Sequence, residues 1–307
     1  MKQKKIALLL AALMLLAAAA GCQPTYEDNA GQQNNSGNDT HNDNGQYDSD
    51  YGTTGDENLS NGAADTTGGM NIDLEKLSSL STESKDWGPG GPRDDQNRSS
   101  GALQYNQKYG QYDALFISET SSKVYMTFDE GYEYGLSDDI LDTLKAKGVK
   151  AMFFITRDFA KAEPELVRRM IAEGHIIGNH SWTHKNYSTF TAEEAQADLK
   201  QLHDYVKENF NYDMKYFRFP SGNFSEQTLA AVQQMGYKSV FWSFAYKDWL
   251  VDAQPDKAES LKKIVDAACP GMIYLLHAVS QTNSDILGQV IDNVKAAGFE
   301  WGDPAEL

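Results

Sequence analysis

The chain has 307 residues with a formal net charge of −17, and 40% of them are hydrophobic, which suffices for a folded domain with a sizeable core. The acidic balance argues against nucleic acid or an anionic lipid surface as the main partner, because both carry negative charge. Only two cysteines, Cys22 and Cys269, occur, so a disulfide-stabilised scaffold is excluded.

The first 22 residues have the pattern of a bacterial lipoprotein signal peptide. A short basic stretch precedes the apolar run 6–20, which is shorter than the ~20 residues of a membrane span. Small residues then lead to Cys22 as in a lipobox, with Ala19 where such motifs usually carry Leu. We expect lipid attachment to Cys22 and an extracytoplasmic domain anchored to the cell membrane. The alternative is ordinary cleavage near Ala20 and secretion.

The residues after the signal peptide predict a tether and then an irregular approach to the domain. Residues 23–72 are rich in Asn, Gly, Asp, Ser and Thr, and no Lys or Arg occurs between Lys5 and Lys76. Low hydrophobicity with unbalanced negative charge predicts a disordered acidic linker, since such a stretch cannot bury enough apolar surface to fold. Residues 73–120 contain WGPGGP and predict irregular structure. The catalytic domain is expected over 121–307.

From residue 123 onward, strand-like and helix-like patterns alternate. Seven apolar stretches predict strands at 123–128, 149–155, 175–179, 215–219, 237–243, 271–276 and, briefly, 299–301. Helices are predicted between them, with starts near Ser137, Glu163, Thr191, Ser225 and Ser284. This alternation indicates a parallel sheet covered by helices, and about seven strands favour a (β/α) barrel over an open sheet.

Polar residues collect after the predicted strands, at the carboxyl ends where β/α folds hold their sites. They are Asp129 and Glu130, His180 and His184, Arg218, Asp248, and His277. Each is ambiguous alone. The histidine pair suits one metal ion if the turn is helical, but it also arises by chance. His277 suits a core position, and Arg218 suits a structural ion pair. Together these residues supply the ligands, base, acid and orienting groups of a metal-assisted hydrolase.

Five short motifs, in order, resemble those of the polysaccharide deacetylase (NodB-homology, carbohydrate esterase 4) family over about 120–305. They are TFDEG at 127–131, HSWTH at 180–184, RFPSG at 218–222, DW at 248–249 and LLH at 275–277. Within the family, TFDEGYEYG, FWSFAYKDW and IYLLHAVS are most similar to the delta-lactam-biosynthetic de-N-acetylases that act on peptidoglycan muramic acid. The resemblance implies a distorted (β/α) barrel and a hydrolase that removes N-acetyl groups from cell-wall glycan.

The resemblance also implies a role for each motif residue. His180 and His184 would hold one divalent metal ion, zinc in the first place, with cobalt or another divalent ion as alternatives. Asp129 would be the general base, oriented by Arg218. The general acid would be His277, oriented by Asp248. The implied substrate-binding residues are Pro220, Ser221, Trp249 and Leu275; a backbone N–H near Ser221 would stabilise the oxyanion, and Trp249 and Leu275 would line the acetyl pocket.

Glu130 departs from the family pattern, which has a second Asp as third metal ligand or, in the delta-lactam group, Asn. Its longer carboxylate either ligates the metal or points elsewhere, and both possibilities stay open. The departure motivates a second hypothesis, a non-catalytic glycan-binding lipoprotein. The sugar also stays open between muramic acid, N-acetylglucosamine of peptidoglycan, and chitooligosaccharide. We expect a monomer that binds peptidoglycan glycan strands and no nucleic acid. Trp182, Tyr187 and Tyr246 are candidates for stacking on sugar rings.

Overall fold

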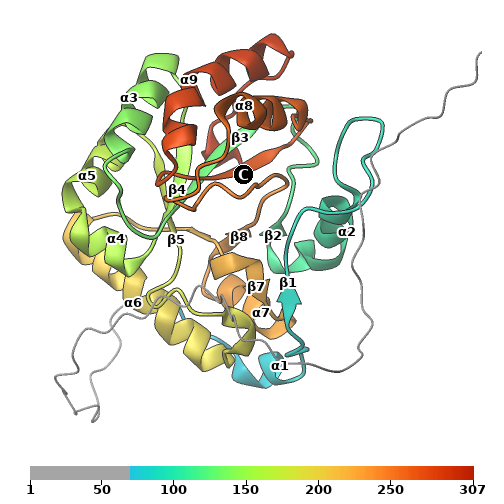
Figure 1. Cartoon of the computed structure of the whole chain (residues 1–307). Helices are drawn as coiled ribbons and strands as arrows, with labels where there is room; N and C mark the ends of the chain where they lie inside the picture. Colours follow the sequence, from blue (N-terminus) through green and yellow to red (C-terminus); the bar gives the residue numbers. More distant parts are fainter. Residues whose placement is uncertain (1–69) are drawn as a thin grey trace, which may run out of the picture. The chain divides into compact units, whose positions relative to one another are not determined.

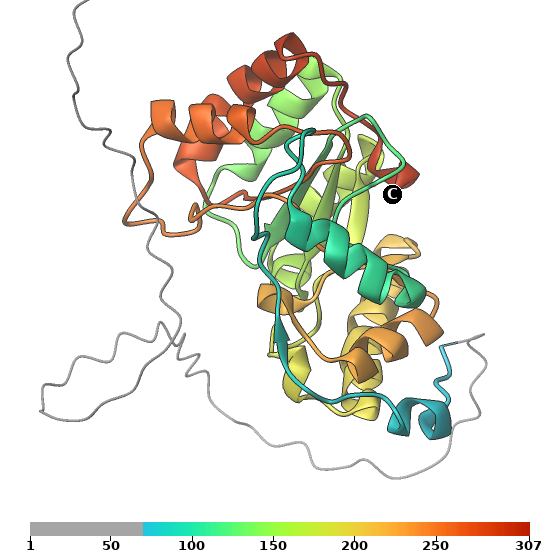
Figure 2. The same cartoon turned by 90° about the vertical axis from the view of Figure 1, so that its right-hand side faces the viewer.

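The computed structural model of the chain describes residues 70–307. In this part, a seven-stranded parallel sheet curls into a half-barrel with helices around it (Figures 1 and 2). The strand order is β2-β8-β6-β5-β4-β3-β9. The predicted (β/α) architecture is therefore confirmed. The predicted signal peptide, Cys22 and the linker up to residue 69 lie outside the described residues.

The strands of the large sheet are β2 (Ala114–Leu115), β3 (Tyr125–Glu130), β4 (Ala151–Ile155), β5 (Ile176–Asn179), β6 (Tyr216–Phe217), β8 (Lys238–Val240) and β9 (Ile273–His277). A second, antiparallel pair joins β1 (Lys85–Asp86) to β7 (Asn223–Phe224). Six of the seven predicted strands match strands of the large sheet. The prediction at 299–301 is wrong, since Trp301 makes only an isolated bridge to Val124.

The prediction of irregular structure for 73–120 needs correction, because this segment supplies the seventh strand, β2. It also contains α1 (Leu74–Ser78) and α2 (Ser100–Tyr109). The glycines and prolines of WGPGGP interrupt regular structure only locally. Beyond them Ser99 caps α2 by accepting a hydrogen bond from Ala102 N. The segment is therefore an integral layer of the fold.

The remaining helices follow the outside of the curled sheet (Figure 1). They are α3 (Ser137–Lys147), α4 (Arg157–Ala162), α5 (Pro164–Ala172), α6 (Ala192–Phe210), α7 (Glu226–Gln234), α8 (Lys257–Asp266) and α9 (Gln281–Ala296), with 3-10 turns η1 (Gly110–Tyr112), η2 (Tyr187–Thr189), η3 (Pro220–Gly222) and η4 (Pro304–Glu306). The predicted capping box at Thr191 is confirmed. The predicted start at Ser284 is wrong, because Ser280 caps α9 one turn earlier. No helix within residues 70–307 has the length and apolar character of a membrane span.

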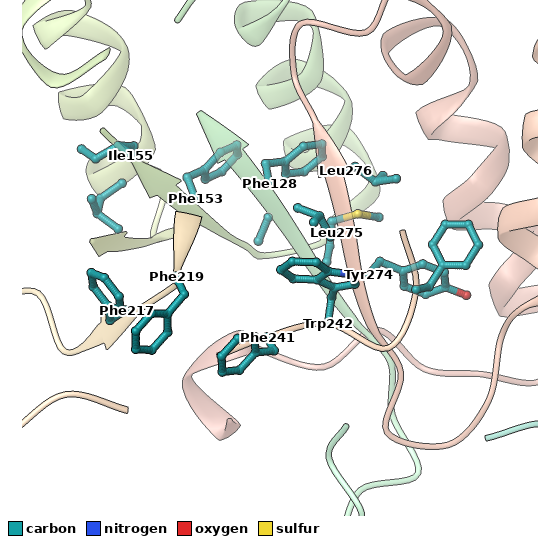
Figure 3. Close-up of a cluster of buried hydrophobic side chains, with 14 of the residues drawn as sticks. Phe128, Phe153, Ile155, Phe217, Phe219, Phe241, Trp242, Tyr274, Leu275 and Leu276 are labelled. Atoms are coloured by element: carbon teal, nitrogen blue, oxygen red, sulfur yellow. The ribbon is translucent and has the colours of Figure 1, made fainter. Parts of the chain in front are cut away.

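Strand side chains alternate between two environments. On the helix side, Phe128, Phe153 and Ile155 belong to the main core, shown in Figure 3. Inside the half-barrel, a smaller cluster contains Tyr125, Met152, Phe154, Val240, Ile273 and Leu307. This alternation determines which side chains at the strand ends face the interior of the half-barrel.

The chain leaving β8 crosses to the free edge of β9. Ser243 N donates to the Ile273 carbonyl at 2.9 Å, and Leu275 N donates to the Phe244 carbonyl at 2.9 Å. These bonds extend the ladder beyond the sheet's last strand. They also bring the loop after β8, with Asp248 and Trp249, to the carboxyl end of β9.

Candidate active site

Two polar centres stand side by side at the carboxyl ends of β3 and β9. The strands pair in parallel, with Asp129 opposite His277. Because Asp129 lies two residues beyond Thr127 and four beyond Tyr125, it belongs to the interior face of the half-barrel. The topology thus brings together an acid and a histidine that are 148 positions apart, counted as 277 − 129.

Arg218 holds Asp129. Its Nη1 donates to Asp129 Oδ1 at 2.8 Å, while its Nε and Nη2 donate to the carbonyls of Val240 and Phe241 at 2.9 and 3.0 Å. The guanidinium is fully buried, and its Cζ lies 4.2 Å from the ring centre of Phe154. Each of the three guanidinium nitrogens thus donates a hydrogen bond, which fixes the direction of the group toward Asp129.

Gly178 on β5 makes room for this arrangement. A Cβ there would lie 2.4 Å from Cδ1 of Phe154, the ring on which Arg218 rests. The close approach of strand and ring therefore requires glycine at this position.

His180 and His184 come together after β5, with ring centres 5.0 Å apart. His180 is buried, and its Nδ1 lies 2.9 Å from the Arg218 carbonyl, an acceptor, so Nδ1 carries the proton. The unprotonated Nε2 is 3.6 Å from Asp129 Oδ2. Desolvation lowers the pKa of His180 to about 4, and it lowers the pKa of His184 as well, although part of that residue reaches solvent. Both rings are therefore neutral near pH 7.

The turn between the two histidines is not helical, contrary to the interpretation of their spacing. Ser181 and His184 have positive φ angles of 77° and 51°, so the rings meet through a tight left-handed loop. The pair still fits a divalent metal ion: neutral imidazoles are its ligands, and a ring N–H bound to a backbone carbonyl is the usual support of a ligating histidine. No group of three or more His, Cys, Asp or Glu side chains within 70–307 is arranged to hold a metal ion.

Glu130 lies in a different environment from Asp129. As the next residue of β3, it belongs to the opposite face and pairs with Ile155 of the main core. It is fully buried, and neither carboxyl oxygen has a hydrogen-bond partner. Burial, with Glu133 and Asp129 nearby, raises its pKa well above the usual range. Among the described ion pairs none joins it to a histidine, which favours the possibility that Glu130 points away from the histidine pair.

Asp248 holds His277 in a second centre. Its Oδ1 lies 2.7 Å from His277 Nδ1, and its Oδ2 accepts from His277 N at 3.0 Å. Asn283 on α9 donates to the same Oδ2 at 2.6 Å and accepts from the Tyr246 hydroxyl. Asp248 is fully buried, whereas His277 is partly open to solvent.

The charged neighbours of Asp129 and His277 shift the pKa values of these two residues in opposite directions. Burial raises the pKa of Asp129, but Arg218 and the nearby His180 and His277 outweigh it, so that pKa lies below its ordinary value. For His277, burial lowers the pKa, but the hydrogen bond and charge of Asp248 outweigh it, so that pKa lies above its ordinary value. These shifts favour an ionised carboxylate beside a protonated imidazole, the pattern of a base and an acid.

The predicted substrate-binding residues around these centres differ in their exposure to solvent. Trp249 is 45% exposed, with its ring centre 5.5 Å from that of His277, and Leu275 is buried on β9. Pro220 is buried, and Ser221 is exposed in η3 with a left-handed φ of 54°.

Trp87, from the segment before the predicted domain, braces η3. Its N donates to the Gly222 carbonyl at 3.0 Å, and its Nε1 donates to the Trp242 carbonyl at 3.0 Å.

Two buried polar residues near the site, Asp198 and Asn283, were not predicted from the sequence. The tyrosines that bind them, Tyr187 and Tyr246, were predicted to contact sugar instead. Tyr187 and Tyr246 are buried, so stacking on sugar is wrong for both. Tyr187 instead donates to Asp198 of α6 at 2.7 Å, as Tyr246 does to Asn283. No sequence pattern singled out Asp198 or Asn283. Asp198 was detectable only as an acid on the otherwise apolar face of a predicted amphipathic helix.

The fold and the two paired centres define a polysaccharide deacetylase, and residues 117–240 match the family of that description. Peptidoglycan-N-acetylmuramic acid deacetylase PdaA of Bacillus subtilis is 40% identical over 200 residues, covering 64% of this chain and 76% of that protein. The chain therefore belongs to the polysaccharide deacetylase family, as its motifs predicted.

Solved structures and further relatives agree with this family assignment. The structure of Bacillus subtilis PdaA, a family 4 carbohydrate esterase, superposes with a TM-score of 0.70 and 35% identity, covering 74% of this chain and 98% of that one. Peptidoglycan-N-acetylglucosamine deacetylase PgdA of Listeria monocytogenes is 28% identical over 190 residues, covering 62% of this chain and 40% of that protein.

Proposed function

We propose that the protein hydrolyses N-acetyl groups of peptidoglycan, with N-acetylmuramic acid as the sugar. The observation that carries the reaction is the opposed pair on β3 and β9, where Arg218 keeps Asp129 ionised and Asp248 keeps His277 protonated. The relative PdaA, whose name specifies N-acetylmuramic acid, supports the choice of sugar.

His180 and His184 would hold one divalent metal ion, with zinc as our choice. When bound there, the ion would supply Lewis-acid activation of water and of the acetyl carbonyl. Asp129 takes the proton of the attacking water as the new C–O bond forms. His277 gives its proton to the sugar nitrogen as the C–N bond breaks, so acetate and an amine result.

The other residues orient the substrate. Trp249 and Leu275 would contact the acetyl methyl group, and the left-handed turn at Ser221 would present a backbone N–H to the developing oxyanion. Trp182 is half-buried beneath Arg157 and Lys161, which leaves Trp249 as the exposed aromatic ring beside His277.

The test is mass spectrometry of muropeptides after incubation with the protein. We expect loss of one acetyl group from muramic acid, abolished by a chelator and restored by Zn²⁺ or Co²⁺. Loss from glucosamine instead would reassign the sugar. Asp129→Asn is expected to lower kcat/KM by ~10²–10⁴-fold, the usual contribution of a general base. Full activity of this variant, or muropeptide binding without turnover by metal-replete wild type, would contradict the proposal.

We also propose that the enzyme works outside the cytoplasmic membrane as a monomer tethered through lipid on Cys22. The support is the basic, apolar and small-residue order of residues 1–22. Metabolic labelling with a palmitate analogue checks the tether: a Cys22→Ser variant should lose the label and leave the membrane fraction.

A further inference from the structure

Asp198 on α6 lies beneath the loop that carries the two histidines. Its Oδ1 accepts from Trp182 N at 2.8 Å and from the Tyr187 hydroxyl at 2.7 Å. Its Oδ2 accepts from Thr183 N at 3.1 Å and from the Thr183 hydroxyl at 2.6 Å. The residue is 6% exposed, and none of the ion pairs found within 70–307 involves it.

The backbone N–H groups of residues 181–184 belong to no helix or strand, so side-chain oxygens accept their hydrogen bonds instead. Ser181 N donates to Asn179 Oδ1, and His184 N donates to Ser181 Oγ, both at 2.8 Å. With the two bonds to Asp198, four consecutive amides from 181 to 184 are bound by side chains. A non-repetitive backbone at the edge of the core thereby has each of these amides paired within the protein.

The same bonds hold an unfavourable backbone. Ser181 and His184 both adopt left-handed φ angles, which residues with a Cβ rarely do and which persist only where the surroundings impose them. Asp198 accepts hydrogen bonds from the amides of Trp182 and Thr183, the two residues that lie between Ser181 and His184. A change in its bonds therefore alters the separation and direction of the two imidazoles.

We propose that Asp198 is the positioning residue of the histidine pair, setting the geometry in which His180 and His184 bind a divalent metal ion. This inference rests on the proposed metal-dependent function. The site needs two acceptor oxygens, because two N–H and two O–H donors converge on the Asp198 side chain. An amide at this position would direct an NH₂ group at one pair of those donors.

The test compares metal affinity across matched variants of the full chain. Asp198→Asn keeps the shape and removes half of the acceptors, and Tyr187→Phe removes one donor. Asp204→Asn is the control, since Asp204 lies on the same helix and, among residues 70–307, forms its one ion pair with Lys200 near the surface. Affinity of the apoprotein for Zn²⁺ is measured by competition with a chromogenic chelator. The Co²⁺ absorption spectrum reports ligand geometry.

We expect Asp198→Asn to weaken Zn²⁺ affinity about 10–100-fold, the usual effect of losing such a support, and to alter the Co²⁺ spectrum. Tyr187→Phe should give a smaller loss, and Asp204→Asn none. Unchanged affinity and spectrum in folded Asp198→Asn would overturn the proposal. If that variant does not fold, the double variant Thr183→Val, Tyr187→Phe must show the loss, and its wild-type affinity would equally overturn it.

Acetate release by the wild-type protein separates this inference from the proposed function. Metal binding that depends on Asp198 without any deacetylation would overturn the proposed function alone. Deacetylation by the wild type with unchanged affinity in Asp198→Asn would overturn the positioning role alone. A wild-type protein that binds neither Zn²⁺ nor Co²⁺ would overturn both.

Discussion

Asp129 and Glu130 are chemically similar neighbours that the pleat of β3 places in opposite environments. Asp129 faces an arginine and a histidine, whereas Glu130 is enclosed in the core with neither oxygen hydrogen-bonded. A carboxyl group surrounded by apolar side chains favours its neutral form. A step of one position along β3 thus separates a carboxylate whose surroundings favour the ionised form from one whose surroundings favour the protonated form.

The pairing of Asp248 with His277 predicts a shift in the pH profile. Asp248→Asn removes the negative charge that raises the pKa of His277 and leaves only a weaker, neutral acceptor for its ring N–H, so that pKa falls. Because the acid must be protonated, activity is lost as pH rises through this pKa. The alkaline limb of kcat/KM should therefore move to lower pH, with a fall of at least about 10-fold at neutral pH. Asp252→Asn, an exposed acid in the same loop, should leave the limb in place.

Replacing Gly178 by a residue with a Cβ should create a local packing defect. In Gly178→Ala the new Cβ would overlap Phe154, so the ring or the strand must shift, with a loss of about 1–3 kcal/mol in the free energy of unfolding. Gly288→Ala is the matched control: its Cβ would meet nothing closer than 3.6 Å, and helix propensity favours Ala. Urea unfolding of both variants checks this, and equal midpoints would contradict it.

At the scale of elements, the antiparallel pair of β1 and β7 links the early segment to the chain directly after η3. Trp87→Ala removes a buried indole and its Nε1 hydrogen bond to the Trp242 carbonyl, while the backbone bond to Gly222 remains, so we expect a loss of about 3–5 kcal/mol in unfolding free energy. The turnover of the folded fraction should fall as well, since Trp242, whose ring lies next to Gly222 of η3, loses this hydrogen bond. Leu74→Ala, at an exposed site in α1, should change neither. Thermal unfolding and acetate release measure the two effects.

Elements with strong local signals could be predicted from sequence, and those defined by distant contacts could not. The run of apolar residues before Asp129 and the capping box at Thr191 are local, and both predictions hold. β2 has two residues and exists because it pairs with β8, which no periodicity reveals. Its hydrogen-bond partners lie more than 120 residues away, as in Ala114 opposite Ser239.

The site residues likewise fall into those that could be predicted from the sequence and those that could not. Residues in motifs could be named in advance, because strand ends collect chemistry in β/α folds. The left-handed turn at His184 and the buried role of Tyr187 depend on α6, which packs against the loop only in the folded chain. The spacing of the two histidines suggested a helical turn, and the position of Tyr187 near a strand end suggested a sugar contact.

At the scale of the molecule, the folded unit extends well upstream of the family match, which begins at residue 117. A chain starting at Met70 keeps the three core clusters found within the described residues, so we expect it to unfold cooperatively. A chain starting at Ile117 lacks Trp87, α2 and β2, and exposes the β8 edge. We expect it to lose cooperative unfolding, as followed by circular dichroism; a transition like that of the longer chain would contradict this.

The crossing of the chain from β8 to β9 also bears on how the protein behaves in concentrated solution. Open sheet edges offer unpaired N–H and C=O groups to other copies of a chain, and long apolar edge strands invite aggregation. β9 is such a strand, Ile-Tyr-Leu-Leu-His, yet Ser243 and Phe244 occupy its outer groups. At the other edge, β2 is only two residues long. Both margins of the sheet are therefore poor templates for self-association, although the curled sheet never closes into a full ring.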